Sequence, residues 1–346
     1  MAKGIVFPLT LGNLTDDGAT PWSSRIGLGT PVQNFKFMID SGTDNTWVTS
    51  KACTTNACLA HGRFDAKQSK SYEVIDPAHV QKDFGPWGIM TVIMGADIFT
   101  LELADGHVVQ TQETLHFEAA IHYTGCQFQV LACDGGIAIP SPYWKKQGIG
   151  ECLMLQLIKN GKLDRPLAAF WMDHERAVGA CTFGFCDQGK YQPETLQWLP
   201  LQDTSESPLD YLWSVKLDEL LVGGKKVEAN IQNFILDSGS SFFKGPSDLI
   251  DSIIQTITRN GVLPTYVSSE KELDLYPEIS LVLGGKHYSL MPVQYFLKLN
   301  KEYWEIGIQT LVGMPEGMLL VGSLFLDSVY TIFDYGGKQL GLADRN

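Results

Sequence analysis

The chain has 346 residues, 44% of them hydrophobic and 11% aromatic, and its formal net charge at pH 7 is −13. This length exceeds what one ordinary hydrophobic core requires and predicts two domains of roughly 150 to 190 residues each. The acidic balance argues against a nucleic-acid partner. The sequence has no uninterrupted apolar run of about 18 residues, which argues against a membrane span.

Short apolar segments separated by glycine, aspartate and asparagine recur along the chain, as in residues 88–103 and 279–290. This pattern is typical of antiparallel β-strands. Two segments predict helices, with apolar positions three and four apart in the longer one. They are residues 151–159 and a segment that runs from a Ser247 cap to Gly261. The sequence therefore predicts an all-β protein with a few short helices.

One short pattern, an aspartate at the end of an apolar strand, occurs twice in the chain. It covers residues 37–43 with Asp40, and it returns at residues 234–240 with Asp237, 197 residues later. The match extends upstream, since Val-Gln-Asn-Phe precedes the first aspartate and Ile-Gln-Asn-Phe the second. The repeat indicates an ancestral half that was duplicated. It predicts two related β-rich lobes, residues 1–190 and residues 191–346, each with one copy.

The residues that flank each aspartate suit a buried turn. Gly42 and Gly239 permit backbone angles that a Cβ would resist. Hydroxyl side chains on either side can donate hydrogen bonds to a carboxylate or to the backbone, so a buried aspartate keeps its partners. These hydroxyl residues are Ser41, Thr43, Ser238 and Ser240. A single Asp-Ser-Gly would be ordinary turn chemistry, but two copies with matching apolar strands argue against coincidence.

Two such turns brought face to face would pair the carboxyls of Asp40 and Asp237. Paired carboxyls in a dry cleft do not both ionise easily, so they share one proton. One can then act as base and the other as acid toward a water that attacks a carbonyl group, without a metal or a covalent intermediate. The seven histidines are scattered without ligand spacing, so no metal site is predicted.

Further motifs carry a resemblance to the pepsin-like aspartic proteases, a family of two-lobed single chains. In the first half, Trp47 follows Asp40 by seven residues, Cys53 and Cys58 are spaced like the family's small disulfide loop, and residues 63–72 resemble the segment after it. Residues 134–138 resemble the buried turn behind the first active loop. The second half contributes the stretches 237–246, 320–322, 330–334 and 340–343.

The resemblance implies a bilobal pepsin-like fold and an endopeptidase that hydrolyses peptide bonds in acid, with large apolar residues flanking the cut. It implies Asp40 and Asp237 as the catalytic pair, a link between the loops through Ser41 and Ser238, and hydrogen bonds to the outer carboxylate oxygens from two hydroxyls, those of Thr43 and Ser240. It also implies a Cys53–Cys58 disulfide, a monomer, inhibition by statine-type peptides, and no cofactor.

The flap is the main departure from the family pattern. That hairpin usually carries a tyrosine whose hydroxyl bonds to the tryptophan at the position of Trp47, whereas here the stretch reads Asp-Phe-Gly-Pro-Trp-Gly at residues 83–88. Phe84 lacks the hydroxyl, and Gly85 is followed by one extra residue. We expect Trp87 to supply an indole donor from an altered flap. Two smaller departures are Ala138 in place of a buried glycine and Asp44 in place of a serine.

The seven cysteines leave at least one free thiol. Cys181 and Cys186 either close a second small loop or remain reduced, and the sequence leaves open the redox state of Cys126, Cys133 and Cys152. The first residues are not typical of a signal peptide or a basic propeptide. We therefore expect either a mature secreted enzyme or, if Met1 is the natural start, a cytoplasmic one such as the bacterial homologues of pepsin.

The rival hypothesis is a catalytically silent binding protein that kept the fold. Such relatives often lose one of the aspartates or its glycine, and this chain retains both pairs. An enzyme is therefore favoured. A homodimeric protease is excluded more firmly, because one chain already carries both halves.

Overall fold

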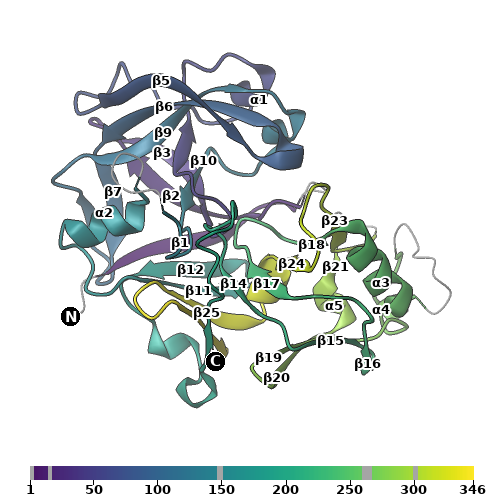
Figure 1. Ribbon diagram of the computed structural model, residues 1–346. Helices are drawn as coiled ribbons and strands as arrows, with labels where there is room; N and C mark the ends of the chain where they lie inside the picture. Colours follow the sequence, from purple (N-terminus) through teal and green to yellow (C-terminus); the bar gives the residue numbers. More distant parts are fainter. Residues whose placement is uncertain (1–3, 15–17, 146–150, 259–266, 299–302) are drawn as a thin grey trace.

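The computed structural model describes residues 4–14, 18–145, 151–258, 267–298 and 303–346, and it is built mainly of β-strands (Figure 1). The strands of the first half are β1 (Ile5–Leu11), β2 (Trp22–Leu28), β3 (Gln33–Asp40), β4 (Trp47–Thr49), β5 (Glu73–Asp83), β6 (Ile89–Asp97), β7 (Phe99–Leu103), β8 (Val108–Gln110), β9 (Leu115–Tyr123), β10 (Gly135–Ala138), β11 (Leu167–Asp173) and β12 (Val178–Phe183).

The second half is also built mainly of β-strands, which are shorter. They are β13 (Gln197–Pro200), β14 (Ser214–Lys216), β15 (Glu219–Val222), β16 (Lys225–Lys226), β17 (Asn233–Leu236), β18 (Phe243–Gly245), β19 (Ile279–Leu283), β20 (Lys286–Leu290), β21 (Phe296–Leu297), β22 (Glu305–Ile306), β23 (Ile308–Thr310), β24 (Met318–Val321), β25 (Val329–Asp334) and β26 (Gln339–Asp344). The predicted all-β class is confirmed.

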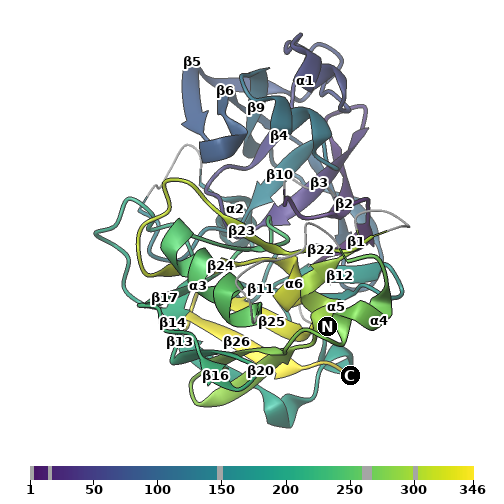
Figure 2. The same ribbon diagram turned by 90° about the vertical axis from the view of Figure 1, so that its right-hand side faces the viewer.

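Helices are short and few among the described residues. The α-helices are α1 (Asn56–Leu59), α2 (Leu153–Lys159), α3 (Ser247–Ile257), α4 (Glu270–Leu273), α5 (Pro292–Tyr295) and α6 (Ser323–Leu326). The 3-10 turns are η1 (Gly85–Trp87), η2 (Cys126–Val130), η3 (Gln188–Lys190) and η4 (Pro193–Thr195). In Figure 2 the helices α3 to α6 gather in the part of the molecule away from β5, β6 and β9. None of the described helices is long and apolar enough to cross a membrane.

The predicted cap of α3 is wrong. Pro246 holds the N-cap position with extended backbone, and Ser247 is the first helical residue. The Ser247 hydroxyl contacts Oδ1 of Asp248 at 3.5 Å and does not accept a bond from a helix N–H. The helix ends at Ile257, and Gly261 lies outside the described residues. The shorter predicted helix begins two residues later than expected, because Cys152 is in extended conformation before α2.

One large sheet joins both halves of the chain. Its order runs from β13 through β26, β25, β11, β12 and β1, and then through β7, β2, β3, β10, β4, β9 and β6 to β5. Separate sheets with the orders β14-β17-β24-β18-β23 and β16-β15-β19-β20 belong to the second half. Figure 1 shows the result as two groups of strands, purple to blue above and green to yellow below. Strands from the two halves of the chain meet where β25 pairs with β11.

The sequence repeat is also a structural repeat. In the first half β3 runs parallel to β10, which is antiparallel to β4. In the second half β17 runs parallel to β24, which is antiparallel to β18. Asp40 is the last residue of β3, and Asp237 directly follows β17. Each half therefore delivers its aspartate from the end of a strand with the same neighbours.

Buried side chains hold these two strands in the interior. Phe37 and Phe234 are 1% and 0% exposed, and both belong to the main hydrophobic core. Trp213 is fully buried and donates its indole N–H to the carbonyl of Ile139 at 2.7 Å. Since Ile139 follows β10 and Trp213 precedes β14, this bond ties the two halves together behind the repeat.

The cysteines form one disulfide, between Cys53 and Cys58, as the family resemblance implied. Cys181 and Cys186 are both free, so the second small loop is not closed by a disulfide. The other free cysteines are Cys126, which is exposed, and the buried Cys133 and Cys152.

Candidate active site

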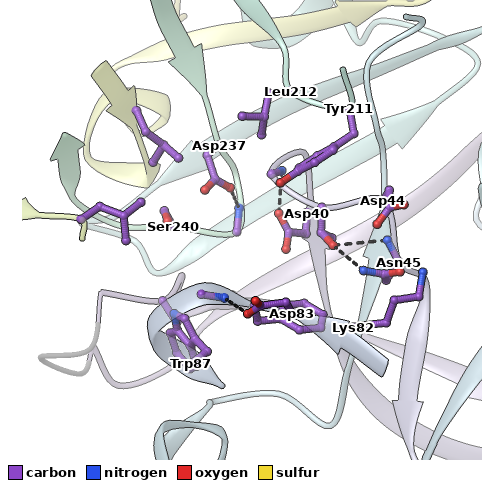
Figure 3. Close-up of a pocket in the computed structure, with 18 of the residues that line it drawn as sticks. Asp40, Asp44, Asn45, Lys82, Asp83, Trp87, Tyr211, Leu212, Asp237 and Ser240 are labelled. Atoms are coloured by element: carbon purple, nitrogen blue, oxygen red, sulfur yellow. Dashed lines mark hydrogen bonds between the residues drawn. The ribbon is translucent and has the colours of Figure 1, made fainter. Parts of the chain in front are cut away.

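The two aspartates are held by equivalent turns. The backbone N–H of Gly42 donates to Oδ1 of Asp40 at 2.8 Å, and the N–H of Gly239 donates to Oδ1 of Asp237 at 2.9 Å. Each bond closes a turn in which a carboxyl group accepts from the residue two positions later. The inner oxygen of each carboxyl is thereby fixed in place (Figure 3).

The two carboxyl groups lie over each other's glycine. A Cβ placed on Gly42 would be 2.4 Å from Cγ of Asp237, and a Cβ on Gly239 would be 2.3 Å from Cγ of Asp40. Any side chain at these positions would occupy the space that the opposite carboxyl fills. The structure thus brings the predicted pair together at the base of one cleft.

The serines that follow the aspartates cross between the halves. The Ser41 hydroxyl donates to the carbonyl of Leu236 at 2.9 Å and accepts the N–H of Ser238 at 2.9 Å. The Ser238 hydroxyl donates to the carbonyl of Ile39 at 2.7 Å and accepts the N–H of Ser41 at 3.0 Å. These four reciprocal bonds are buried, and they make the expected link between the two loops.

The hydroxyls after the glycines are placed differently from the prediction. Thr43 Oγ1 accepts the backbone N–H and the side-chain amide of Asn45, both at 3.3 Å. Ser240 Oγ accepts from the ammonium group of Lys244 at 3.1 Å. Among the described residues, neither hydroxyl bonds to a carboxylate. Asn45 and Lys244 are buried polar groups that need partners of their own, and they take these hydroxyls.

Burial raises the pKa of the Asp40 carboxyl well above its usual range, and the nearby charge of Asp237 adds to this effect. The N–H of Gly42 and the positive charge of Lys244 act in the opposite direction and are weaker. The pair therefore holds a proton at pH values where an isolated aspartate has lost it. Such a pair carries both an acid and a base, which is what activation of a water requires.

The pair opens into a cleft of about 540 Å³. One wall is apolar and comes from the first half, with Met38, Trp47, Phe128 and Leu131, and the opposite wall includes Tyr211, Leu212 and Met314. Figure 3 shows Asp40 and Asp237 with Tyr211 and Leu212 on one side and Asp83 and Trp87 of the flap on the other. The cleft combines apolar side walls with a polar floor, which suits an extended chain with apolar side chains.

The flap is the hairpin of β5 and β6. Its strands pair as far as Asp83 and Ile89. The connecting turn contains Gly85 and Gly88, whose φ angles of +60° and +102° favour glycine. Phe84 and Trp87 both pack on the ring of Phe128, with centroid distances of 5.6 and 6.0 Å. The flap therefore presents aromatic rings toward the apolar wall.

The expected indole hydrogen bond from Trp87 is not among the hydrogen bonds of the described residues. The ring of Trp47 packs edge-on against Tyr123 at 6.0 Å. Ala138 causes no break in β10: it pairs with Asp40, and its N–H donates to Oγ1 of Thr46 at 3.1 Å. At the matching position, a Cβ on Gly322 would be 2.4 Å from the carbonyl oxygen of Ser240.

Comparison with known proteins decides the family. The family model described as "Eukaryotic aspartyl protease" matches residues 22–345, nearly the whole chain. The chain belongs to the pepsin-like aspartyl protease family. This protease is 28% identical over 329 residues to cathepsin E of Aquarana catesbeiana, with 92% of the chain and 78% of that protein covered.

Two further relatives have the same extent of similarity. Gastricsin of Rattus norvegicus is 27% identical over 328 residues, with 92% of the protease and 79% of the relative covered. Vacuolar protease A of Aspergillus fumigatus is 27% identical over 331 residues, with 92% and 78% covered. The protease is accordingly a peptide hydrolase of the aspartic endopeptidase type.

Sequence reasoning missed several residues of the cleft. Lys82 on the flap strand forms an ion pair with Glu118 on β9 at 3.2 Å, and both side chains are nearly buried. Tyr211 reaches the cleft from the loop before β14, and Lys244 approaches Ser240 from β18. The sequence did contain a signal for Lys244, since it is a charged residue within an otherwise apolar strand. Lys82, Tyr211 and Glu118 gave no local signal, because only the fold brings Lys82 and Tyr211 to the cleft and places Glu118 beside Lys82.

The described part of the protease contains no group of three His, Cys, Asp or Glu side chains placed to hold a metal ion.

Proposed function

We propose that Asp40 and Asp237 are the catalytic pair of this protease and that they hydrolyse peptide bonds through an activated water. The observation that carries the proposal is the mutual packing of each carboxyl on the other's glycine. A water between the two carboxyls loses a proton to the ionised one as its oxygen attacks the carbonyl carbon. The protonated carboxyl donates to the carbonyl oxygen, and the resulting diol collapses when the amide nitrogen takes up a proton and leaves.

The other residues of the two turns have supporting roles in this proposal. Gly42 and Gly239 leave room for the opposite carboxyl, and Ser41 and Ser238 hold the two loops at a fixed separation. Thr43 and Ser240 act indirectly, because they hydrogen-bond Asn45 and Lys244 rather than the carboxylates. Fixed carboxyls need little reorganisation during the reaction, which is how electrostatic preorganisation lowers a barrier.

The substrate in this proposal is an extended polypeptide with large apolar residues beside the cut. Met38, Trp47 and Phe128 form an apolar wall for one such side chain, and Phe84 and Trp87 cover it from the flap. Statine-type peptides, which mimic the diol, would occupy the same cleft. We also propose a monomer whose lobes divide near residue 190, with neither nucleic acid nor membrane as partner.

Activity in this proposal is highest below about pH 5, because the pair must hold one shared proton. The raised pKa of Asp40, caused first by burial and then by Asp237, supports a protonated member of the pair in that range. The other member must remain ionised, so the rate falls again at very low pH.

The test is cleavage of an unfolded protein between pH 3 and 7, with and without a statine-type peptide, beside an Asp237→Ala variant. Acid cleavage that the inhibitor blocks and the variant lacks is the expected result. A rate maximum at neutral pH would contradict the shared-proton proposal. A folded wild-type protein that neither cleaves nor binds the inhibitor would favour a silent relative.

A further inference from the structure

Four charged side chains other than the catalytic pair line the cleft, and three of them are engaged. Lys82 is paired with Glu118, and Lys244 donates to Ser240 and to the carbonyl of Gly18 at 3.1 Å. Asp83 accepts the N–H of Gly85 at 2.8 Å. The fourth is Asp44, whose carboxylate has neither a hydrogen bond nor an ion pair with any described residue. The cleft thus holds one carboxylate that remains available to a ligand.

Asp44 lies beside the reacting centre. It follows the turn of Asp40 by one residue and is partly accessible. Figure 3 shows it on the side of Asp40 away from Ser240. A peptide that crosses the catalytic pair therefore passes Asp44 within a few residues of the scissile bond.

Tyr211 completes the surroundings of Asp44. Burial raises the pKa of Tyr211 to about 12, and the negative charge of Asp44 is the next largest cause. The Tyr211 hydroxyl therefore keeps its proton, and Asp44 and Tyr211 lie close enough in the cleft for the charge of Asp44 to act on that hydroxyl. A lysine or arginine side chain fits this corner, because its apolar stem packs on an aromatic ring while its charged head reaches the carboxylate.

We propose that Asp44 is a specificity-determining residue that selects lysine or arginine at the substrate position lying between it and Tyr211. The inference rests on the proposed function, since it names a substrate preference of the same cleft. The engaged state of Lys82 and Lys244 matters here, because neither ammonium group is available to neutralise Asp44. An acidic substrate residue would meet the carboxylates of Asp44 and of the catalytic pair and would be disfavoured.

The experiment compares peptides that share one apolar cleavage site and differ at each flanking position, where lysine, glutamine or glutamate is placed in turn. Rates are read by mass spectrometry at the highest pH that still gives measurable cleavage. Wild type should cleave the lysine peptide about two- to fivefold faster than the glutamine peptide at one position, the range expected for a partly exposed ion pair. The glutamate peptide should be slowest at that position.

Variants then assign the preference. Asp44→Asn should abolish the lysine preference while the glutamine peptide is cleaved at the wild-type rate, and Asp44→Lys should favour glutamate at the same position. Asp251→Asn makes the same chemical change on the exposed face of α3, outside the cleft, and should leave the preference intact. Thermal unfolding of each variant checks that the fold is retained.

The outcomes separate the inference from the proposed function. Cleavage without a position-specific lysine preference, a preference that survives in Asp44→Asn, or an equal loss for all peptides in Asp44→Asn would each overturn the inference alone. Failure of wild type to cleave any peptide, or cleavage that persists in Asp237→Ala, would overturn the proposed function itself.

Discussion

The backbone of Gly239 lies against the carboxyl group of Asp40, so that a Cβ at Gly239 would be 2.3 Å from both Cγ and Oδ1. Gly42 has the same relationship with Asp237. Contacts below 3 Å to a carboxyl held by a hydrogen bond from its own turn leave no room for adjustment. Each glycine is therefore required by the partner's side chain as well as by its own turn.

Gly239→Ala should reduce kcat/KM by about 100-fold, since a shift near 1 Å in a reacting group has an effect of that order. The new methyl group must displace the Asp40 carboxyl from its position. The measurement is peptide cleavage at the optimum pH, with Gly189→Ala as control. A Cβ at Gly189 meets only one atom within 4 Å, Oδ1 of Asp187 at 3.3 Å. Wild-type cleavage by Gly239→Ala would contradict this assignment of the glycine.

Ser41→Ala should lower the free energy of unfolding by about 2 kcal/mol, because it leaves a buried carbonyl and a buried N–H without partners. Ser238→Ala should cost a similar amount, since it removes the other two of the four bonds. Urea denaturation provides the measurement. Ser247→Ala is the control. The Ser247 side chain is exposed and does not cap α3, so this variant should change the free energy of unfolding by no more than about 0.5 kcal/mol. Equal values for all three variants would disprove a stabilising role for the serine link.

The juxtaposition of Asp40 and Asp237 and the serine link between their turns could be predicted because the information is local and occurs twice. A strand, a carboxyl, a hydroxyl and a glycine in the same order twice specify two equivalent turns, and the duplication implies that they face each other. The roles of Thr43 and Ser240 could not be predicted in the same way. Their hydroxyls have other partners within reach, Asn45 and Lys244, and the choice depends on which groups the fold buries.

Other parts of the site depend on contacts between distant segments. Lys82 and Glu118 are an unremarkable lysine and glutamate in the sequence, and only the pairing of the flap with β9 makes them a buried ion pair. The predicted Ser247 cap is absent for a local reason. Serine is a favourable N-cap, but Pro246 before it has extended backbone and occupies that position.

The raised pKa of Asp40 makes a prediction about stability. In the folded protein this carboxyl, raised first by burial and next by Asp237, binds its proton more tightly than its ordinary value of 3.8 implies. Between 3.8 and the raised value the folded state holds more protons than the unfolded state. The contribution of Asp40 to stability is therefore greatest below pH 3.8 and falls as the pH rises.

Asp40→Asn should remove the free-energy cost of ionising this buried carboxyl. The difference in free energy of unfolding between the variant and wild type should therefore grow in favour of the variant from pH 3 to pH 7. Each unit of pKa shift is worth about 1.4 kcal/mol. Denaturation of both proteins across this range gives the difference directly, with Asp251→Asn as an exposed control. A difference that is constant with pH, or that shrinks, would contradict the raised pKa. Activity should be lost at every pH.

The ion pair beneath the flap should respond strongly to removal of one partner. Lys82 and Glu118 are 14% and 5% exposed, and Glu118→Gln should lower the free energy of unfolding by about 3 kcal/mol because it leaves a nearly buried ammonium group without its counter-charge. Lys145 and Glu206, at 59% and 93% exposure, form the matched exposed pair. Glu206→Gln should change stability by less than about 1 kcal/mol. A similar effect for both variants would show that burial does not govern the pair.

The aromatic rings of the flap allow the contribution of packing to be separated from that of hydrogen bonding. Phe84 and Trp87 both rest on Phe128. Trp87→Ala removes one ring from the cover of the cleft and should reduce kcat/KM about fivefold, which is what the loss of an aromatic contact of about 1 kcal/mol implies. Phe84→Tyr keeps its ring and should have little effect.

Trp87→Phe decides between the two roles of the indole. It retains an aromatic ring and removes the N–H donor, so packing on Phe128 alone predicts activity close to wild type. If the indole instead donates a hydrogen bond to the substrate or to a water during catalysis, Trp87→Phe should fall to the level of Trp87→Ala, with the loss mainly in kcat. The observed packing favours the first outcome, and steady-state kinetics on one peptide with all three variants measures it.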